Sequence, residues 1–555
     1  MYQRITIAAS RVARPDAVAV TLFASPSQLP QGYRQIDRDT GGALSALLKR
    51  HEFAGERGEV LCLYPAAGPA ERLYVLGLGE RRRFTGETLR VAAAKLARSL
   101  HGAQVTSLRL MIDDIAESDL VAAKSRPGYA QALLGRAMGD GLSIGNFQCD
   151  QFKGTAAKKA TGRKPDKPSS LTVELDPRYR EPAQRGLDIG ESVNLCRGLQ
   201  ATPPNIADPA YIVAQCKKLA KQVGLSCRVI DAKKAAQLGM NGLLAVGAAG
   251  SSPPALIALE WKPKAIPAKL ADSHGRALIG KIRNPTASTA APAAKSEIRN
   301  GPVLLVGKAV TFDTGGYSIK PAENMDKMKY DKSGGMAVIG AMHALAHLKL
   351  PLHVVGLIPV AENLVSDAAY RPGDILTLYN GVTVEVTNTD AEGRLILADA
   401  LAYGCKTYRP DAVIDLATLT GGVVVTFGTL CAGLFTTERK LRSSLFDAAD
   451  FTGERVGHLP LWEEHRELLK GTHGDLVNSA GREAHPIQGA AFLSHFVSAD
   501  GKGDAMDHPP AGGWAHLDIA GMADVKKDTP LYPSGPTGYG VRLLVRWMEA
   551  RCGEK

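Results

Sequence analysis

The sequence NTDAEGRLILADALAYG, residues 388–404, joins a cluster of charged side chains to an apolar run. Asp390, Glu392 and Arg394 alternate with uncharged residues, and the run that follows has the composition of a buried helix. Charged residues at a helix start are commonly solvated caps. The alternative is that these three side chains point into one site where a strand gives way to a helix.

The segments around this stretch predict an α/β fold. Apolar runs typical of buried strands occur at 303–313, 352–361 and 411–419, and 375–388 contains an Asn-Gly pair that indicates a tight hairpin. Helical patterns lie between them. The first third of the chain also alternates strand-like with helical segments, the strands at 4–10, 17–25, 59–65, 72–79, 107–112 and 171–175, the helices at 85–101 and 129–142.

A chain of 555 residues is too long for one core, so we expect two domains. Residues 1–178 form the predicted N-terminal α/β domain, and an amphipathic helix at 179–202 connects it to a second α/β domain at 203–555. Residues 262–300 are rich in Ala, Pro, Lys and Ser, a composition that cannot build a core, and we interpret them as a surface insertion.

The composition, 45% apolar and 22% charged, is ordinary for a globular protein. The longest weakly polar run, 421–435, is too short to span a bilayer. Eight scattered cysteines without a CxxC pair favour a reduced, cytoplasmic compartment. The arginines before Asp16 leave a mitochondrial targeting segment as an alternative to an opening strand.

Chemistry concentrates in three segments of the second domain. The first, 306–321, carries Lys308, Asp313 and Lys320, and the second carries Asp331 just before a helical stretch. The third is 388–404. In each segment a carboxylate falls where a strand ends or a helix begins, which is where open α/β sheets bind ligands.

Four carboxylates from three strand ends would repel one another unless cations lay between them. Oxygen ligands without nearby Cys or His suit Mg²⁺, Mn²⁺ or Zn²⁺, and four carboxylates suffice for two ions that share bridging ligands. Two such ions can activate a water for hydrolysis. The competing interpretation is that Asp331 and Asp390 are helix caps. Spacing alone leaves both open.

The strings GKAVTFDTGGYSIKP, MKYDKSGG and NTDAEGRLILADAL resemble, in order and spacing, the signature segments of the leucine aminopeptidase family of two-metal exopeptidases. GLQATPPN, DLATLTGG, LPLWEEH, DLVNSAGRE, WAHLDIAGMA and GPTGYGVR extend the resemblance over nearly all of 195–545. It implies a smaller N-terminal, macro-like α/β domain and a larger catalytic α/β domain with a central mixed sheet.

The resemblance implies a role for each residue of the centre. Asp313 and Glu392 would bridge two divalent ions, Lys308 and Asp331 would complete the tighter site, and Asp390 the exchangeable one. Zn²⁺ or Mn²⁺ are the expected ions, with Mg²⁺ or Co²⁺ possible in the exchangeable site. The attacking species would be a bridging hydroxide, with a bicarbonate held by Arg394 relaying its proton and Lys320 stabilising the oxyanion.

The same resemblance implies the substrate and the assembly. Met328, Thr418, Gly421 and Ala520 would line the pocket for the first side chain of a short peptide, with a preference for leucine. The expected assembly is a homohexamer, a dimer of trimers, without membrane attachment.

The sequence departs from the usual family pattern at three places. Ala309 follows the first metal lysine where Gly is common, and KSGGMA follows Asp331 where Met and an alanine pair are common. Ala523 replaces a larger pocket residue, which predicts a roomier pocket.

Other motifs have weaker interpretations. His343 and His347 have the spacing of a zinc helix but lack its glutamate, so we expect a packed or surface pair. The cysteines are expected to be buried small hydrophobes. A formal charge of +11, with basic runs at 81–83 and 158–167, leaves nucleic-acid binding as an alternative or additional function.

Overall fold

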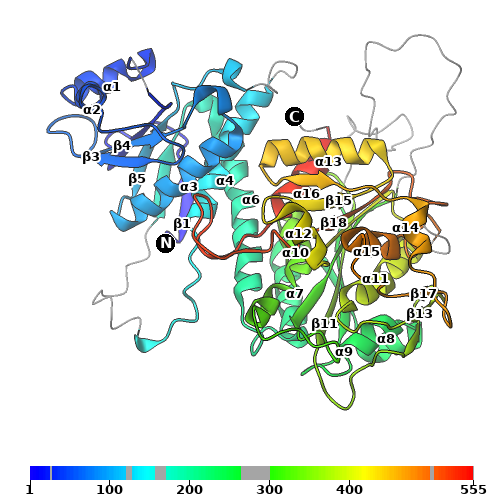
Figure 1. The fold of residues 1–555 in the computed structure, drawn as a ribbon. Coiled ribbons are helices and arrows are strands. Elements are labelled where there is room, and N and C mark those ends of the chain that lie inside the picture. Colours follow the sequence, from blue (N-terminus) through cyan, green and yellow to red (C-terminus); the bar gives the residue numbers. More distant parts are fainter. Residues whose placement is uncertain (26–27, 121–127, 157–169, 264–300, 501–504, 554–555) are drawn as a thin grey trace, which may run out of the picture.

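The computed structural model describes residues 1–25, 28–120, 128–156, 170–263, 301–500 and 505–553. The basic run at 158–167 and nearly all of the insertion predicted at 262–300 lie outside the described residues. Figure 1 shows a smaller N-terminal lobe in blue and cyan and a larger lobe in green to red, with a long helix between them.

The N-terminal lobe is built on a six-stranded sheet of order β1-β6-β5-β2-β4-β3, in which only the β3–β4 pair is antiparallel. Its strands are β1 (Arg4–Ile7), β2 (Ala17–Leu22), β3 (Val60–Leu63), β4 (Arg72–Gly77), β5 (Ser107–Met111) and β6 (Ser170–Glu174). The opening segment forms β1 and pairs with β6, as the strand interpretation of the N-terminus predicts.

Helices cover both faces of this sheet, and the alternation of side chains along β2 shows how. Ala17 and Ala19 face α3 (Gly86–Gly102) and α4 (Tyr129–Gly145), whereas Val18 and Val20 face α1 (Arg34–Asp39) and α2 (Ala43–Arg50). A short 3-10 turn, η2 (Arg81–Arg83), follows β4.

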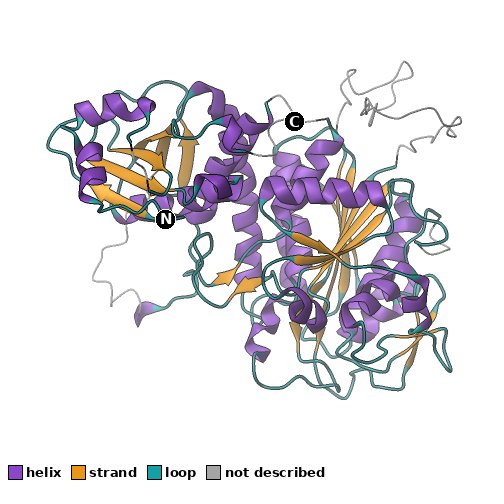
Figure 2. Cartoon of the chain, turned by 45° about the horizontal axis from the view of Figure 1, so that its top comes forward, coloured by secondary structure: helices purple, strands orange, loops and turns teal. Residues whose placement is uncertain are grey.

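The larger lobe contains a nine-stranded mixed sheet of order β16-β15-β18-β14-β9-β11-β8-β7, with β10 paired to β11 (Figure 2). The strands are β7 (Ser226–Ile230), β8 (Ala255–Trp261), β9 (Val303–Gly307), β10 (Ala309–Asp313), β11 (Val354–Asn363), β14 (Ala412–Ala417), β15 (Ala432–Phe435), β16 (Val456–His458) and β18 (Trp514–Asp518). The predicted α/β fold with a mixed sheet in the second domain is confirmed.

Two layers of helices enclose this sheet. One core contains residues of α7 (Pro209–Val223), α10 (Ser333–His347), α13 (Arg439–Thr452) and α16 (Val541–Arg551). The other contains residues of α8 (Ala232–Leu238), α9 (Asn241–Gly247), α11 (Glu392–Tyr408) and α15 (His485–Ser494). The remaining elements are η6 (Met325–Tyr330), α12 (Gly421–Phe427), α14 (Glu463–Glu467), the Asn-Gly hairpin β12 (Ile375–Thr377) and β13 (Thr383–Glu385), β17 (Leu476–Val477), β19 (Asp524–Val525) and β20 (Gly535–Pro536).

The long helix α6 (Pro177–Ala201) lies between the lobes, beside α4 and α10 (Figure 1). Glu549 of α16 joins the lobes by an ion cluster: Arg136 of α4 binds it through two nitrogens at 2.9 and 3.0 Å, and Arg185 of α6 at 2.7 Å. Burial opposes ionisation of Glu549, but the two guanidinium groups hold its pKa below the usual value. The ionised carboxylate of Glu549 therefore links α16 to α4 and α6.

Four parallel strands, β10, β11, β14 and β18, end at the same edge of the large sheet. The single strand predicted at 303–313 is instead two strands, β9 and β10, with Lys308 at the break. The break occurs because β9 pairs with both β11 and β14, whereas β10 pairs with β11 alone. Lys308 therefore lies directly after Gly307, the last residue of this segment that pairs with β14.

Helix α10 begins very close to this break. A Cβ atom on Gly335 would lie 2.8 Å from the Cβ of Ala309 and 2.9 Å from Cγ2 of Ile358, both closer than carbon atoms tolerate. Ala309 itself is fully buried and has no positive φ. Ala309 and Gly335 thus fit each other: the methyl group of Ala309 occupies the space that the absence of a side chain at Gly335 leaves free.

We expect Gly335→Ala to lower the free energy of unfolding by about 1–3 kcal/mol through overpacking. Ala309→Gly in the same chain should restore part of the loss, with Ile358 accounting for the rest. The measurement is denaturant unfolding of both single variants and the double variant. Gly102→Ala, where an added Cβ meets nothing within 4 Å, is the control. Strictly additive effects would contradict the coupling.

Candidate metal centre

Carboxylates from two segments meet at the sheet edge. Asp313 ends β10, and Asp390 and Glu392 lie at the start of α11; one oxygen of each lies within 4.8 Å of the others, a spacing that could hold a metal ion. Asp331, between η6 and α10, joins this group through Lys308. The structure thus brings together all four carboxylates that the sequence analysis singled out.

Lys308 lies at the centre of one half of the site. Its Nζ is 2.8 Å from Asp331 Oδ1, 2.8 Å from Glu392 Oε1 and 2.8 Å from the carbonyl oxygen of Thr418. Burial alone would lower the pKa of Lys308, but the Asp331 and Glu392 carboxylates raise it above its usual value. A Cβ on Gly393 would lie 2.6 Å from Lys308 Cε, so this lysine position requires glycine there.

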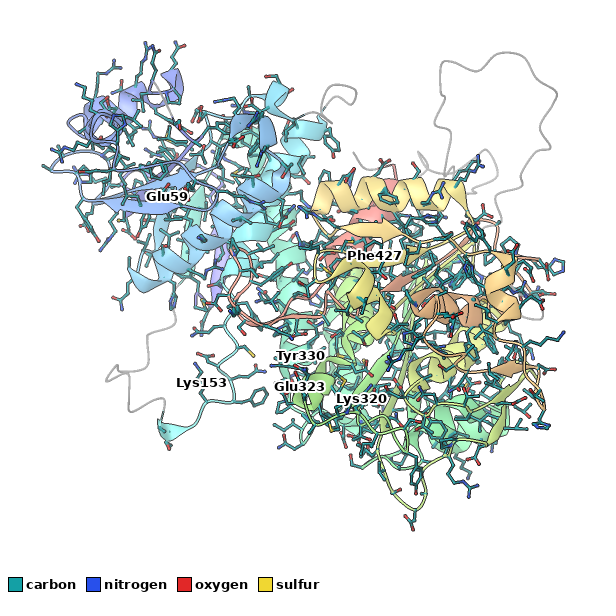
Figure 3. All side chains as sticks on the ribbon, in the orientation of Figure 1. Glu59, Lys153, Lys320, Glu323, Tyr330 and Phe427 are labelled. Carbon is teal, nitrogen blue, oxygen red and sulfur yellow. The ribbon has the colours of Figure 1, made fainter. Side chains whose placement is uncertain are left out.

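Lys320 lies in the other half. Its Nζ is 2.8 Å from Asp313 Oδ2 and also contacts Asp390 Oδ1. Burial opposes its charge, but Asp313 above all raises its pKa. Lys320 is labelled in Figure 3, on the ribbon of the larger lobe. The two lysines therefore divide the four carboxylates between them.

The cap interpretation of Asp331 and Asp390 is not supported. The N-cap residues of α10 and α11 are Lys332 and Ala391, and neither helix start has a side-chain cap hydrogen bond. Asp331 instead accepts a hydrogen bond from Thr418 Oγ1 at 2.7 Å. Both aspartate side chains therefore contact other groups of the site, Asp331 through Thr418 and Asp390 through Lys320, and not the amides of a helix start.

The sequence analysis missed the residues that fix the two acidic loops. Asn363 at the end of β11 donates to Asp313 Oδ1 at 2.8 Å and to the carbonyl of Thr389 at 3.0 Å. Thr389 exchanges hydrogen bonds with Ser318, and Tyr370 donates to its carbonyl oxygen at 2.7 Å. The only signal for Asn363 is its place at the end of a buried strand.

The donor set suits divalent cations. Burial and mutual repulsion raise the pKa values of Asp313 and Asp331, and burial with the charges of Asp313 and Glu392 raises that of Asp390 to about 7. Asp331 Oδ2 and Glu392 Oε2 are buried without a hydrogen-bond partner among the described residues. Oxygen ligands of this kind, held close and partly unsatisfied, fit two hard or borderline ions.

Arg394 lies in the first turn of α11 and is almost completely buried. Its Nη1 donates to the carbonyl of Asn478 at 2.6 Å, and its Nε has no hydrogen-bond partner among the described residues. Burial lowers its pKa to about 10. The guanidinium is thus fixed at one end and keeps a buried donor for a small anion.

Three of the four predicted pocket residues, Thr418, Gly421 and Ala520, lie on segments that Asp518 connects. Asp518, at the end of β18, accepts hydrogen bonds from the amides of Leu419 and Ala520 at 3.1 and 3.2 Å and from Thr420 Oγ1 at 2.6 Å. Thr418 and Gly421 flank this contact, and Met328 lies on η6. Asp518 was missed because Leu419 and Thr420, two of its three partners, are about a hundred residues away in sequence.

The remaining motifs have other roles. His343 and His347 were expected to be a packed or surface pair. Their rings stack; His343 is half-buried, with its Nδ1 2.8 Å from Ser192 Oγ, and His347 is exposed. Arg81 is neutralised by Asp114 and Asp119 at 2.7 and 2.6 Å, which weakens the nucleic-acid interpretation of the basic run.

The prediction of uniformly buried cysteines is wrong for four of the eight. Cys196, Cys216, Cys405 and Cys552 are buried, whereas Cys62, Cys227 and Cys431 are half-buried and Cys149 is exposed. Cys149 lies in the segment after α4, outside the core of either lobe.

Comparison with known proteins identifies the family. The catalytic-domain model of the cytosol aminopeptidase family matches residues 194–282 and 293–545, and the N-terminal-domain model of the same family matches residues 18–153. A probable cytosol aminopeptidase of Chlorobaculum tepidum is 38% identical over 530 residues, covering 92% of this chain and 94% of that relative. The corresponding protein of Chlorobium limicola is 37% identical over 506 residues, covering 90% of each chain.

Solved structures agree with this assignment. The bottromycin maturation enzyme BotP in complex with Mn has a TM-score of 0.77 at 29% identity, covering 97% of this chain and 100% of that chain. A tomato leucine aminopeptidase variant has a TM-score of 0.76 at 27% identity, covering 98% of this chain and 96% of that chain. None of the helices in the described ranges is long and apolar enough to cross a membrane.

The sequence signatures, the fold and these relatives agree over both lobes, and the chain therefore belongs to the cytosol aminopeptidase family and is a metal-dependent aminopeptidase.

Proposed function

We propose that this aminopeptidase removes leucine-like residues from the N-terminus of short peptides with two divalent ions. The observation that carries the proposal is the convergence of four buried or half-buried carboxylates on Lys308 and Lys320. Two ions there would lower the pKa of a water molecule and stabilise charge that develops on the scissile carbonyl.

The residues divide into two ligand sets. Asp313 and Glu392 would bridge the ions, because they come from the two acidic loops, approach each other within 4.8 Å, and contact Lys320 and Lys308 respectively. Lys308 and Asp331 would complete the tighter site. Asp390 would complete the exchangeable site, which suits a side chain that remains about one third exposed. Lys308 can act as a ligand only as a neutral amine, which neighbouring dications favour.

Two cationic side chains would stabilise the negative charges that take part in the reaction. Lys320, with its Nζ between Asp313 and Asp390, would keep its proton and stabilise the oxyanion. Arg394 would hold bicarbonate as the proton acceptor, because its buried guanidinium is fixed by Asn478 and its Nε is free to donate.

Specificity would come from Met328, Thr418, Gly421 and Ala520, which are apolar or small. Gly421 and Ala520 leave space for a branched aliphatic side chain. Ala523, which is buried beside Thr537, leaves this region roomier than a larger residue would, so aromatic first residues should also be accepted.

Several finer properties follow from the relatives. The Mn of BotP supports Mn²⁺ as one physiological ion, with Zn²⁺ as the other candidate and Mg²⁺ or Co²⁺ possible in the exchangeable site. Bacterial relatives named as cytosol aminopeptidases support a cytoplasmic location. We also propose a homohexamer, a dimer of trimers, which mass photometry would test.

Metal removal should abolish hydrolysis of leucine anilide, and adding Mn²⁺ or Zn²⁺ should restore it. Asp390→Ala should lower kcat/KM at least about a hundredfold, because loss of residues that merely support a metal ligand already costs 10–100-fold. Asp367→Ala, an exposed carboxylate in the loop after β11, is the control. Full activity of the chelated enzyme or of Asp390→Ala would contradict the mechanism.

Asp518→Ala should raise KM for leucine anilide about tenfold, since three hydrogen bonds that join the pocket segments are lost. Asp518→Asn retains an oxygen for the two amides and a donor for Thr420 Oγ1, so its KM should stay near that of the wild type. Steady-state kinetics at saturating Mn²⁺ make the comparison. Equal KM values for Asp518→Ala and the wild type would refute the role.

A further inference from the structure

Lys332, which directly follows Asp331, is a fully buried lysine. Its Nζ donates to two backbone carbonyl oxygens, that of Thr202 at 3.1 Å and that of Lys329. Within the described part of the chain, no ion pair between this amine and a carboxylate is present. The side chain is thus held by neutral acceptors only.

Placing an amine in the interior is unfavourable unless its hydrogen bonds repay the lost hydration. A methionine of similar length would fill the same volume without that cost. Packing therefore does not explain the lysine. Its distinctive contribution is the pair of hydrogen bonds, and these join two separate elements.

The two acceptors lie at functionally different places. Thr202 is the C-cap residue of α6, the helix between the lobes. Lys329 belongs to η6, the turn that also carries Met328 and leads directly into Asp331. The amide of Asp331 donates to the carbonyl of Met328 at 3.2 Å, so these residues belong to one hydrogen-bonded turn. Through its two hydrogen bonds, Lys332 therefore links the end of α6 to the η6 turn. That turn carries Met328, a proposed pocket residue, and leads into Asp331, a proposed metal ligand.

We propose that Lys332 is a positioning residue that fixes the η6 turn, and through it the placement of Asp331 and Met328, against the end of α6. This inference rests on the proposed function of Asp331 as a metal ligand. Asp331 Oδ1 contacts Lys308 and Thr418, and Oδ2 has no partner among the described residues. The backbone that Lys332 holds would keep Oδ1 within reach of its two partners.

Lys332→Met tests the inference, because methionine fits the volume and removes both hydrogen bonds. The matched control is Lys327→Met, a half-buried lysine of the same turn whose only ion pair among the described residues is with neighbouring Asp326 at 3.5 Å. Three quantities are measured: Mn²⁺ affinity by calorimetry, hydrogen exchange of the η6 amides without metal, and KM and kcat for leucine anilide at limiting and saturating Mn²⁺.

We expect Lys332→Met to weaken Mn²⁺ binding about 10–100-fold, as for other residues that orient ligands, and to speed exchange in η6. Excess Mn²⁺ should restore kcat while KM stays raised, and Lys327→Met should match the wild type throughout. A folded Lys332→Met protein with wild-type Mn²⁺ affinity and exchange would overturn this inference alone. A wild-type protein that binds no Mn²⁺ would overturn the proposed function, and this inference with it.

Discussion

Mutual repulsion among Asp313, Asp331, Asp390 and Glu392 is the constraint on which the rest of the structure depends. Four carboxylates at one sheet edge cannot all ionise unless positive charge lies between them. Burial first, and then the charges of the neighbouring carboxylates, raise the pKa values of the three aspartates. Lys308 and Lys320 supply part of that charge. Divalent ions would supply more positive charge, and they would also lower the pKa of a bound water molecule.

The fold keeps these groups in place by close backbone approach and by buried hydrogen bonds. Gly393 gives Lys308 its space, and Gly335 lets α10 begin beside Ala309. Asn363, at the end of β11, donates a hydrogen bond to Asp313 of one acidic loop. Asp518, at the end of β18, accepts one from Leu419 beside the pocket. Asn363 and Asp518 come from two strands of one sheet, with β9 and β14 between them, so the sheet itself sets the spacing between the acidic loops and the pocket walls.

Sequence reasoning recovered the alternating strands and helices, because apolar periodicity reflects burial directly. It also found the four carboxylates, since each ends a strand or starts a helix. It missed Asn363, Asp518 and Lys332, whose partners lie up to about 130 residues away and leave no local pattern. The break at Lys308 was missed for a related reason: it depends on which neighbours β9 and β10 share, and one apolar run does not reveal this.

The most direct test of the two-ion centre is anomalous diffraction at the manganese edge from crystals of the enzyme equilibrated with Mn²⁺. The account predicts two peaks about 3.5–4 Å apart, both within bonding distance of Asp313 and Glu392, with Asp331 and Lys308 at one and Asp390 at the other. Manganese bound elsewhere, or no peak among these carboxylates, would contradict it.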